Sequence, residues 1–318
     1  MHIALLAILA CAPTKQHELE PAVVDTGPTG DLLLSATSSE GGWSQVITAS
    51  SNACGLREGR IACWGGLTGA TGLPEGDTFV AFDVSPVEGS VGCALTAEGS
   101  IDCWGEPATE VHTDVPEGTF SSVAVGEGLA CALDTAGHAT CWGGIEARGE
   151  DYHPPSDTSR EALVMHGADA CSLQKGTLDC WGLYFLDGFI EHPSFDLTAP
   201  LLGLSASQEG YCAWTTDTLA CWNPAPVLYG TFAYDTYSVS GLIDALLIDY
   251  NAGYEGKLEL LALFEDGSLW FLGRDETFEF DPGPYVAASG DTGAGCGLDA
   301  EGYVTCWWAE GAQALTPP

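Results

Sequence analysis

Cysteine is the residue whose type and spacing offer the most chemistry in this chain. Thirteen cysteines occur among 318 residues, and twelve of them form six pairs whose members lie nine or ten residues apart. The pairs are Cys54 with Cys63, Cys93 with Cys103, Cys131 with Cys141, Cys171 with Cys180, Cys212 with Cys221, and Cys296 with Cys306. Each pair can form a disulfide or remain as two buried thiols. We expect disulfides, because a further copy of the motif replaces both partners at once, with Leu261 and Phe271.

The residues between paired cysteines are typical of β-hairpins. Glu58-Gly59 and Lys175-Gly176 stand at the centres of two copies, where glycine accepts the positive φ of a two-residue loop. Four copies suit three-residue loops with glycine at the left-handed position, and Thr216-Asp217 is the one turn without glycine. Counting outward from each turn places paired cysteines opposite one another at a site without hydrogen bonds. Opposed Cα atoms approach there to about 4.5 Å, which is within the range of a disulfide.

These hairpins recur about every 40 residues from Trp43 onward, which indicates a strand-rich repeat such as a propeller. A further apolar strand candidate precedes each hairpin, as in Phe79–Val84 and Phe120–Val125. The run Leu242–Ile248 is predicted to be a strand of the sixth unit. The extra length around 223–240 is predicted to be a surface loop. Helical periodicity is scarce, so we expect an all-β chain whose residues 43–318 form one closed domain.

The repeated pattern Cys-Ala-Leu-x-x-x-Gly-x-x-x-Cys-Trp-Gly resembles the repeats of the regulator of chromosome condensation family. The resemblance extends from about Trp43 to Trp308, and it implies a seven-bladed β-propeller with hairpin disulfides in six blades. The short period is more similar to the bacterial secreted branch, which includes propeller-type inhibitors of β-lactamase. Terminal strands usually close the ring in such proteins, and the candidates here are 32–34 and 312–315. Some relatives are exchange factors for a small GTPase, but that intracellular role conflicts with paired cysteines.

The N-terminal 42 residues differ from the repeats in composition. Residues 3–10 form a short apolar run, too short to span a bilayer and similar to a secretion signal. Ile8-Leu9-Ala10-Cys11 resembles the lipobox of bacterial lipoproteins, in which the cysteine carries the lipid, although Met1-His2 supplies no Lys or Arg. A plain signal peptide or a mis-assigned start codon are the alternatives. We therefore predict a signal over 1–11 with Cys11 as lipid attachment site, and a flexible tether over 12–42 rich in Pro, Gly, Ser and Thr.

Forty-five acidic residues against eight basic ones give a formal net charge of −37. Nucleic-acid binding requires clustered Lys and Arg, so we expect no such partner, and no membrane contact except through the lipid anchor. The acidity serves either solubility or the attraction of a basic partner. Scattered histidines, paired cysteines and the lack of a calcium-loop motif predict no metal site and no cofactor. No nucleophile elbow, phosphate loop or dinucleotide fingerprint is present, so we predict no catalytic residues.

Aromatic residues fall into two groups. The tryptophans that follow the second cysteines are predicted to pack blade against blade rather than to form a sugar platform, because nearly every copy has one (Trp64, Trp104, Trp142, Trp181, Trp222 and Trp307). Other rings lie in the variable links between hairpins, where a rigid ring can present loops for binding. From these links we select Tyr152, Tyr184, Phe185, Tyr234 and Tyr237 as candidate binding residues.

The sequence thus favours a binding module: an exported, lipid-anchored monomer of the cell envelope that recognises a protein or glycan through loops on a propeller face. An extracellular hydrolase acting through loop carboxylates is one alternative. A structural envelope protein without a dedicated ligand is the other. Perturbed carboxylates in one funnel would favour the hydrolase, whereas a contiguous apolar patch on one face would favour the binding module.

Overall fold

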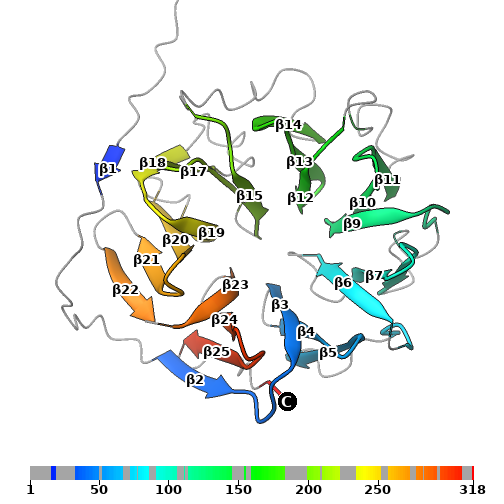
Figure 1. The fold of residues 1–318 in the computed structure, drawn as a ribbon, viewed down its shortest axis with the longest axis horizontal. Coiled ribbons are helices and arrows are strands. Elements are labelled where there is room, and N and C mark those ends of the chain that lie inside the picture. Colours follow the sequence, from blue (N-terminus) through cyan, green and yellow to red (C-terminus); the bar gives the residue numbers. More distant parts are fainter. Residues whose placement is uncertain are drawn as a thin grey trace, which may run out of the picture.

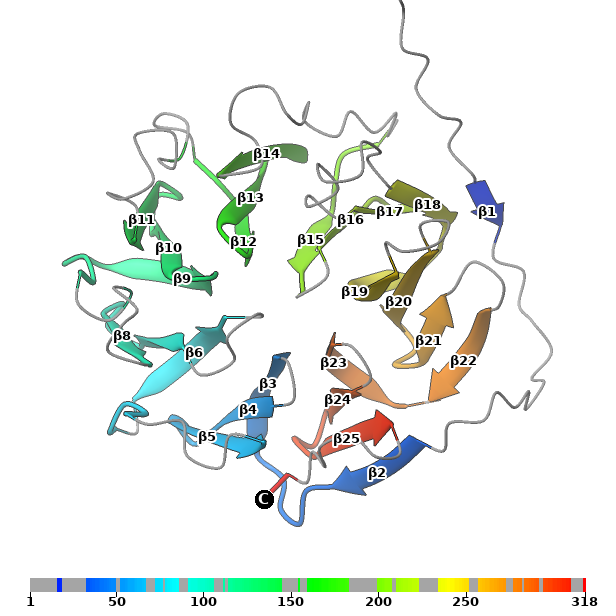
Figure 2. The ribbon, with the colours of Figure 1, turned by 180° about the vertical axis from the view of Figure 1, so that it is seen from behind.

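The structure is a computed structural model. It describes residues 16–18, 33–49, 52–66, 72–76, 78–85, 91–105, 111, 114–144, 154, 159–182, 199–207, 210–222, 234–251, 257–272, 277–281, 283–291, 294–309 and 317–318. Strands in this part of the chain form seven small sheets, which stand around a common centre as the blades of a β-propeller (Figures 1 and 2). This arrangement confirms the predicted all-β propeller with disulfides in six blades. None of the described residues belongs to a helix long and apolar enough to cross a membrane.

Each blade begins with an inner strand at the centre and continues outward through antiparallel strands. Blades 1 to 4 are β3 (Trp43–Ala49), β4 (Asn52–Arg57) and β5 (Arg60–Gly65); β6 (Phe79–Val84), β7 (Gly92–Thr96) and β8 (Ile101–Trp104); β9 (Phe120–Val125), β10 (Leu129–Asp134) and β11 (Ala139–Gly143); and β12 (Ala162–His166), β13 (Asp169–Gln174) and β14 (Thr177–Gly182). Blades 5 to 7 are β15 (Gly203–Ala206), β16 (Tyr211–Trp214), β17 (Thr218–Trp222) and β18 (Tyr234–Ser238); β19 (Leu242–Asn251), β20 (Lys257–Phe264), β21 (Leu269–Leu272) and β22 (Thr277–Asp281); and β23 (Tyr285–Asp291), β24 (Ala294–Asp299) and β25 (Val304–Ala309) with β2 (Leu33–Thr37).

The six disulfides join the cysteines that the hairpin register predicts. Cys131 lies opposite Cys141, for example, and the six Cα–Cα distances are 3.9 to 4.1 Å. In blade 6, Leu261 lies opposite Phe271 in the same register position. The two-residue loops have positive φ at Glu58 and Gly59 and at Lys175 and Gly176. The alternation of the strands therefore places each cysteine pair and its leucine on one face of the blade.

The core consists of seven apolar clusters, each lying between two neighbouring blades. In the cluster between blades 2 and 3, Cys93 and Leu95 of blade 2 pack with Ala130 and Trp142 of blade 3. The repeat thus directs its cysteine and leucine toward one neighbour and its alanine and tryptophan toward the other. The tryptophans that follow the second cysteines are all buried, at 6% exposure or less, which confirms their packing role (Trp64, Trp104, Trp142, Trp181, Trp222 and Trp307).

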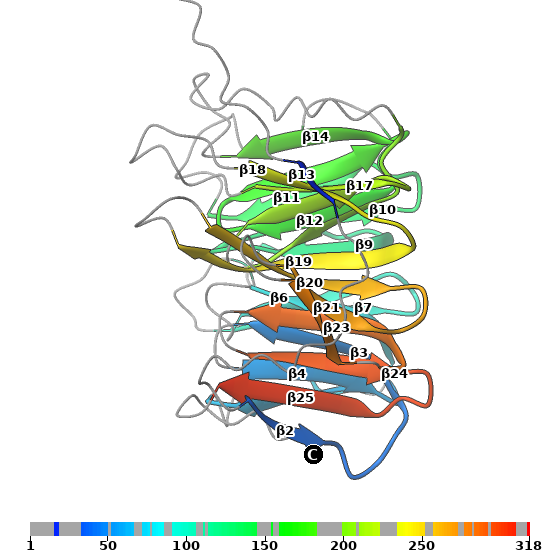
Figure 3. The ribbon, with the colours of Figure 1, turned by 90° about the vertical axis from the view of Figure 1, so that its left-hand side faces the viewer.

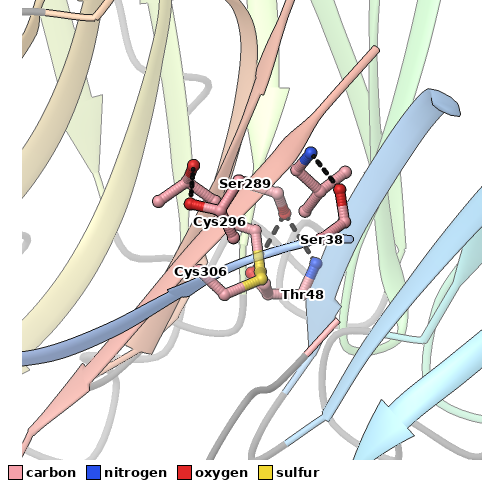
Figure 4. Close-up of a disulfide and its surroundings, with 8 residues drawn as sticks. Ser38, Thr48, Ser289, Cys296 and Cys306 are labelled. Atoms are coloured by element: carbon pink, nitrogen blue, oxygen red, sulfur yellow. Dashed lines mark hydrogen bonds between the residues drawn. A yellow bond between two sulfur atoms is a disulfide. The ribbon is translucent and has the colours of Figure 1, made fainter. Parts of the chain in front are cut away.

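A β-strand from the N-terminal segment closes the ring. β2 pairs antiparallel with β25, from Leu33 opposite Ala309 to Thr37 opposite Thr305. Ser38 extends this pairing, because its backbone N–H donates to the Val304 carbonyl at 2.8 Å and its Oγ accepts from the Val304 N–H at 3.1 Å. Figure 4 shows this junction beside the Cys296–Cys306 disulfide. Of the two candidate closing segments, 32–34 overlaps β2 at residues 33 and 34, whereas 312–315 lies outside the described residues.

Two boundaries drawn from the sequence need correction. The predicted tether over 12–42 contains β2, so the propeller uses residues from Leu33 onward. It also contains β1 (Gln16–Glu18), which pairs in parallel with β18 at the outer edge of blade 5. The predicted loop around 223–240 contains β18 itself, which pairs with β17. These strands are short, with three to five residues each, so their sequences show little apolar periodicity. The predicted strand in the sixth unit is confirmed as β19.

One face of the ring holds the hairpin turns between the second and third strands of the blades, and we call it the hairpin face. It lies on the right in Figure 3, where the turn from β24 to β25 is visible. On this face a turn carbonyl of each blade accepts the N–H of a residue at the start of the next blade, at 2.8 to 3.1 Å. The pairs include Gly59 with Phe79 and Gly137 with Arg160, and Gly302 with Trp43 completes the circle. The turns therefore hold neighbouring blades together.

Candidate functional site

The centre of the ring is surrounded by the inner strands β3, β6, β9, β12, β15, β19 and β23 (Figure 2). Residues of these strands line the cavities there, and we call this central space the channel. Each of these strands forms the inner end of its sheet, so one of its edges has no strand paired to it within the blade. Backbone N–H and C=O groups on such an edge require other partners. Side chains from neighbouring blades supply several of them.

Gln45 on β3 shows this bridging most clearly. Its Nε2 donates to the Phe82 carbonyl of blade 2 at 2.8 Å, and its Oε1 accepts from the Phe82 N–H at 3.1 Å. Between blades 7 and 1, the Thr48 N–H donates to Ser289 Oγ at 2.8 Å (Figure 4). Between blades 5 and 6, Ser205 Oγ donates to the Ala245 carbonyl. Polar residues on the inner strands are thus explained in part by blade-to-blade hydrogen bonding.

His166 joins blades 4 and 5 in the same way. The side chain is buried, and its Nδ1 lies 2.8 Å from the Ser207 carbonyl oxygen. Because a carbonyl only accepts, Nδ1 must carry the proton and donate it. Burial lowers the pKa of His166, so the neutral imidazole is favoured and the ring acts as a fixed connector.

Two carboxyl groups face the same channel. Asp83 on β6 accepts a hydrogen bond from the Val125 N–H of blade 3 at 2.7 Å through Oδ2. Burial raises its pKa to about 7, although hydrogen bonds from the Val125 and Val84 backbones act in the opposite direction. Asp244 on β19 accepts from the Ala245 N–H at 2.8 Å, and burial raises its pKa to about 7 as well. Both groups are therefore partly protonated near neutral pH.

Two cavities occupy the channel. One of about 240 Å³ lies toward the far ends of the inner strands, at Val125, Ser207 and Gly290. The other, of about 560 Å³, opens at the hairpin face, since its lining includes the first residues of β15 and β19. We call this second cavity the mouth. Asp83 lines both cavities and Asp244 lines the mouth, so the two carboxyl groups share one space.

A recurrent β-bulge marks the hairpin-face ends of the inner strands, and three of its positions, Glu161, Leu202 and Ile243, line the mouth. At the start of five inner strands the register skips one residue, which leaves Ser44, Val80, Ser121, Ile243 and Val286 unpaired with the second strand. Glu161 and Leu202 hold the corresponding positions just before β12 and β15. Four of these seven positions carry branched aliphatic side chains that are exposed: Val80 by 55%, Leu202 by 61%, Ile243 by 42% and Val286 by 51%. A bulge directs an extra side chain away from the sheet, and here it turns apolar groups toward solvent.

Of the five candidate binding residues selected from the sequence, the structure describes two, Tyr234 and Tyr237. Tyr152, Tyr184, Phe185 and Cys11 lie outside the described residues. Tyr234 begins β18 opposite Trp222, and its side chain is also outside the description. The prediction that Tyr237 is an exposed binding residue is wrong. It lies within β18, is 1% exposed and packs between blades 5 and 6. The described residues contain no group of three or more His, Cys, Asp and Glu side chains arranged to hold a metal ion.

Sequence reasoning missed the channel residues, although a signal was present. Asp83 and Asp244 are single acids inside otherwise apolar strands, Phe79–Val84 and Leu242–Ile248. A lone carboxyl in such a run must face a cavity or a donor, because an unpaired buried charge is costly. The exposed aliphatics gave no such signal, since exposure at a bulge cannot be distinguished from burial by residue type.

Comparison with known proteins identifies the fold and nothing finer. No protein-family model and no curated protein matches the chain. Among solved structures, human WBSCR16 superposes with a TM-score of 0.60 at 10% identity, covering 85% of this chain and 88% of that one. The CRINKLY WD40 ectodomain of the Arabidopsis thaliana receptor kinase ACR4 gives 0.57 at 14% identity, covering 87% and 99%. Prp20p from Saccharomyces cerevisiae gives 0.51 at 11% identity, covering 84% and 82%.

The fold is that of a β-propeller. These solved neighbours agree with the predicted propeller at the level of architecture. The identities of 10 to 14% support no statement about activity.

Proposed function

We propose that this propeller is an exported binding module that recognises a partner from a rigid ring. The observation that carries the proposal is the mouth, where Leu202 and Ile243 remain exposed beside a cavity of about 560 Å³. Exposed apolar groups at the rim of a cavity are typical of interaction surfaces. A protein or a glycan is the expected partner.

The disulfides support export. Six hairpins each contain one, and such bonds persist in oxidising compartments outside the cytosol. The yeast neighbour is described by its binding to Gsp1p and histones, and the plant neighbour as a receptor-kinase ectodomain, so propellers of this kind are used for recognition in other settings. A binding role is consistent with both observations.

Anchoring through Cys11 is part of the proposal and places the protein on the envelope or cell surface. The test is the Cys11→Ser variant, followed by separation of membrane and soluble fractions. The variant should move to the soluble fraction, whereas the wild type should remain with membranes. A wild-type protein that is soluble after export, with a free thiol at Cys11 or without the residue, would refute the anchor but not the binding role.

Recognition is tested by cross-linking the exported protein in its native envelope and identifying what is captured. Alanine variants at Tyr184, Phe185 and Tyr234, made separately, test the links as a binding surface. Lost capture with an unchanged melting temperature supports a contact there. The variant Tyr237→Ala is the packing control, because its buried ring predicts a lower melting temperature.

A second candidate function is favoured by one observation, the pair of carboxyl groups in the mouth. Asp83 and Asp244 both have a raised pKa, as a general acid and a general base of a hydrolase can require. Asp83, however, is already engaged with the Val125 backbone of the next blade, which gives it a scaffold role. Purified wild-type protein that hydrolyses ester, glycoside or peptide substrates, with activity lost in Asp83→Asn and Asp244→Asn, would favour the hydrolase. A structural envelope role would be favoured if cross-linking captures nothing and no substrate is turned over.

A further inference from the structure

Exposed apolar residues gather on one sector of the hairpin face. Leu202, Ile243 and Val286 occupy equivalent bulge positions on the neighbouring blades 5, 6 and 7. Tyr303, exposed by 40%, follows the hairpin turn of blade 7 on the same face. We call these four residues the apolar sector. Leu202 and Ile243 also line the mouth, and exposed apolar groups gathered around a cavity are typical of interaction sites.

The charges around the apolar sector have one sign. The hairpin turns of blades 5, 6 and 7 carry exposed acids and no described base: Asp217, Glu265, Asp266 and Glu301. The described Lys and Arg residues of this face lie elsewhere, at Arg57 and Arg60 in blade 1 and at Arg160 and Lys175 in blade 4. Arg160 is buried and paired with Asp179. In blades 5 to 7 acidic turns thus accompany the exposed aliphatic groups, as Glu98 accompanies Val80 in blade 2.

The mouth beneath the sector continues this charge inward. Its described lining includes the carboxyl groups of Asp83, Glu161 and Asp244, and contains no Lys, Arg or His. Glu161 is exposed at the rim, whereas Asp244 lies deeper and is half-buried. A positively charged group entering the mouth would therefore pass an exposed carboxylate first and reach a second carboxyl group inside.

We propose that the mouth and the apolar sector bind a segment of a protein partner that presents a Lys or Arg side chain flanked by apolar residues. The cation enters the mouth toward Glu161 and Asp244, while the flanking residues cover Leu202, Ile243 and Val286. The inference deepens the proposed binding function and rests on it. A second copy of this chain is a poor occupant, because each copy has a net charge of −37 and brings further acids to the contact. A neutral glycan would leave the acidic rim unused.

The probe is a phage-displayed library of random dodecapeptides, selected against the full exported chain with its disulfides intact. Selected peptides should be enriched in Lys or Arg next to Leu, Ile, Val or aromatic residues, and poor in Asp and Glu. Synthetic copies of the best peptides are then measured by fluorescence anisotropy at two salt concentrations. Replacing the cation in a selected peptide with Glu should abolish binding.

Variants of the protein locate the site. Leu202→Ser combined with Ile243→Ser should weaken peptide binding about tenfold or more, as expected for anchors at the centre of a contact. Val80→Ser is the matched control, since Val80 occupies the same bulge position on blade 2, outside the sector, and its exposure of 55% lies between those of Leu202 and Ile243. It should change affinity less than about twofold. Glu161→Gln should weaken binding and reduce its dependence on salt.

Three results would overturn the inference: no peptide enriched, enriched peptides without a cation, or equal losses from Val80→Ser and from the double variant. The proposed function fails separately, if native cross-linking captures no partner. If a partner is captured with equal efficiency by the wild type and by the Leu202→Ser/Ile243→Ser variant, the binding role stands and this site is wrong.

Discussion

At the scale of the residue, one short motif performs two packing tasks. Cys131 packs in the cluster shared with blade 4, and Leu133 lies on the same face of the sheet. Ala130 and Trp142 pack in the cluster shared with blade 2. Substitutions at these four positions therefore act at an interface between blades. Blade 6 shows what can replace the disulfide, because Leu261 there lies in the cluster shared with blade 7 and opposes Phe271.

The register of blade 6 predicts that a seventh disulfide can be introduced. In the variant Leu261→Cys/Phe271→Cys the two residues occupy the position that cysteines hold in the other blades, so they should oxidise to a disulfide. Closing this loop should contribute about 2.5 kcal/mol, offset by the loss of two large apolar side chains from the core. Peptide mapping without reduction should show the link, and the single variant Leu261→Cys should show one free thiol. Two free thiols in the double variant would refute the register.

The channel carboxyl groups predict an unusual dependence of stability on pH. Asp83 and Asp244 have folded pKa values raised from 3.8 to about 7, so the folded state binds more protons than the unfolded state between these values. Their contribution to stability therefore falls as the pH rises from about 4 to about 7. Replacing both by Asn should raise the free energy of unfolding relative to wild type, and by clearly more at pH 8 than at pH 5.

Urea unfolding at these two pH values measures the effect. Burial lowers the pKa of His166, so its contribution to stability falls as the pH decreases, opposite to that of the two carboxyl groups. Wild type and variant both contain His166, so this contribution cancels when their stabilities are compared. Asp266→Asn is the control: Ser268 donates to this exposed carboxylate and lowers its pKa, so it is ionised at pH 5 and pH 8 alike. Its effect should be the same at both values. A pH-independent difference for the double variant would show that the channel groups are solvated.

At the scale of the element, the hairpin turn is the unit that joins blades. Gly137 in blade 3 has φ of +85°, and its carbonyl accepts the Arg160 N–H of blade 4 at 2.9 Å. A Cβ at this position would lie 2.6 Å from the Arg160 carbonyl oxygen. Blade 5 manages without glycine, because Thr215 Oγ1 accepts the Thr218 N–H at 3.0 Å and donates to Asp217 at 2.8 Å. Its turn still offers the Asp217 carbonyl to the next blade.

The substitution Gly137→Ala should therefore cost more than its backbone conformation alone. Gly128→Ala is the matched control, because Gly128 also has positive φ, +68°, but a Cβ there meets nothing within 4 Å. The control should lose about 1–2 kcal/mol from the left-handed conformation. Gly137→Ala should lose clearly more, because the start of blade 4 must move. Equal urea midpoints for the two variants would mean that the contact between blades is dispensable.

The hairpins could be predicted from the sequence because their causes are local. Glycine turns, alternating apolar residues and paired cysteines all lie within eleven residues, as in Cys131–Cys141. The mouth could not be predicted, since Glu161, Leu202 and Ile243 meet only when three blades are in place. Gln45 illustrates the same limit, because its partner is the backbone of Phe82 in the next blade. The repeat predicted the architecture, but not the residues that the ring brings together.

At the scale of the whole molecule, closure depends on a strand that comes from the opposite end of the chain. β2 is the fourth strand of blade 7, and its Ala36 packs on the cluster between blades 7 and 1. The same junction is held by Ser289 with Thr48 and by the Gly302 carbonyl with Trp43. A ring without this strand would expose the edge of β25, and an exposed edge promotes both opening and aggregation.

Two shortened chains test this closure. One begins at Leu32 and retains β2, and the other begins at Ser38 and lacks it, so both lack β1 and differ only in the strand that pairs with β25. Loss of that ladder, which includes the Thr37–Thr305 side-chain contact at 3.0 Å, should cost on the order of 3 kcal/mol. The shorter chain should melt at a lower temperature and form larger species in size-exclusion chromatography, whereas the longer one should behave as the full chain does. Because the Ser38 bonds to Val304 remain in both, equal melting temperatures would mean that these bonds and the core between blades 7 and 1 close the ring without β2.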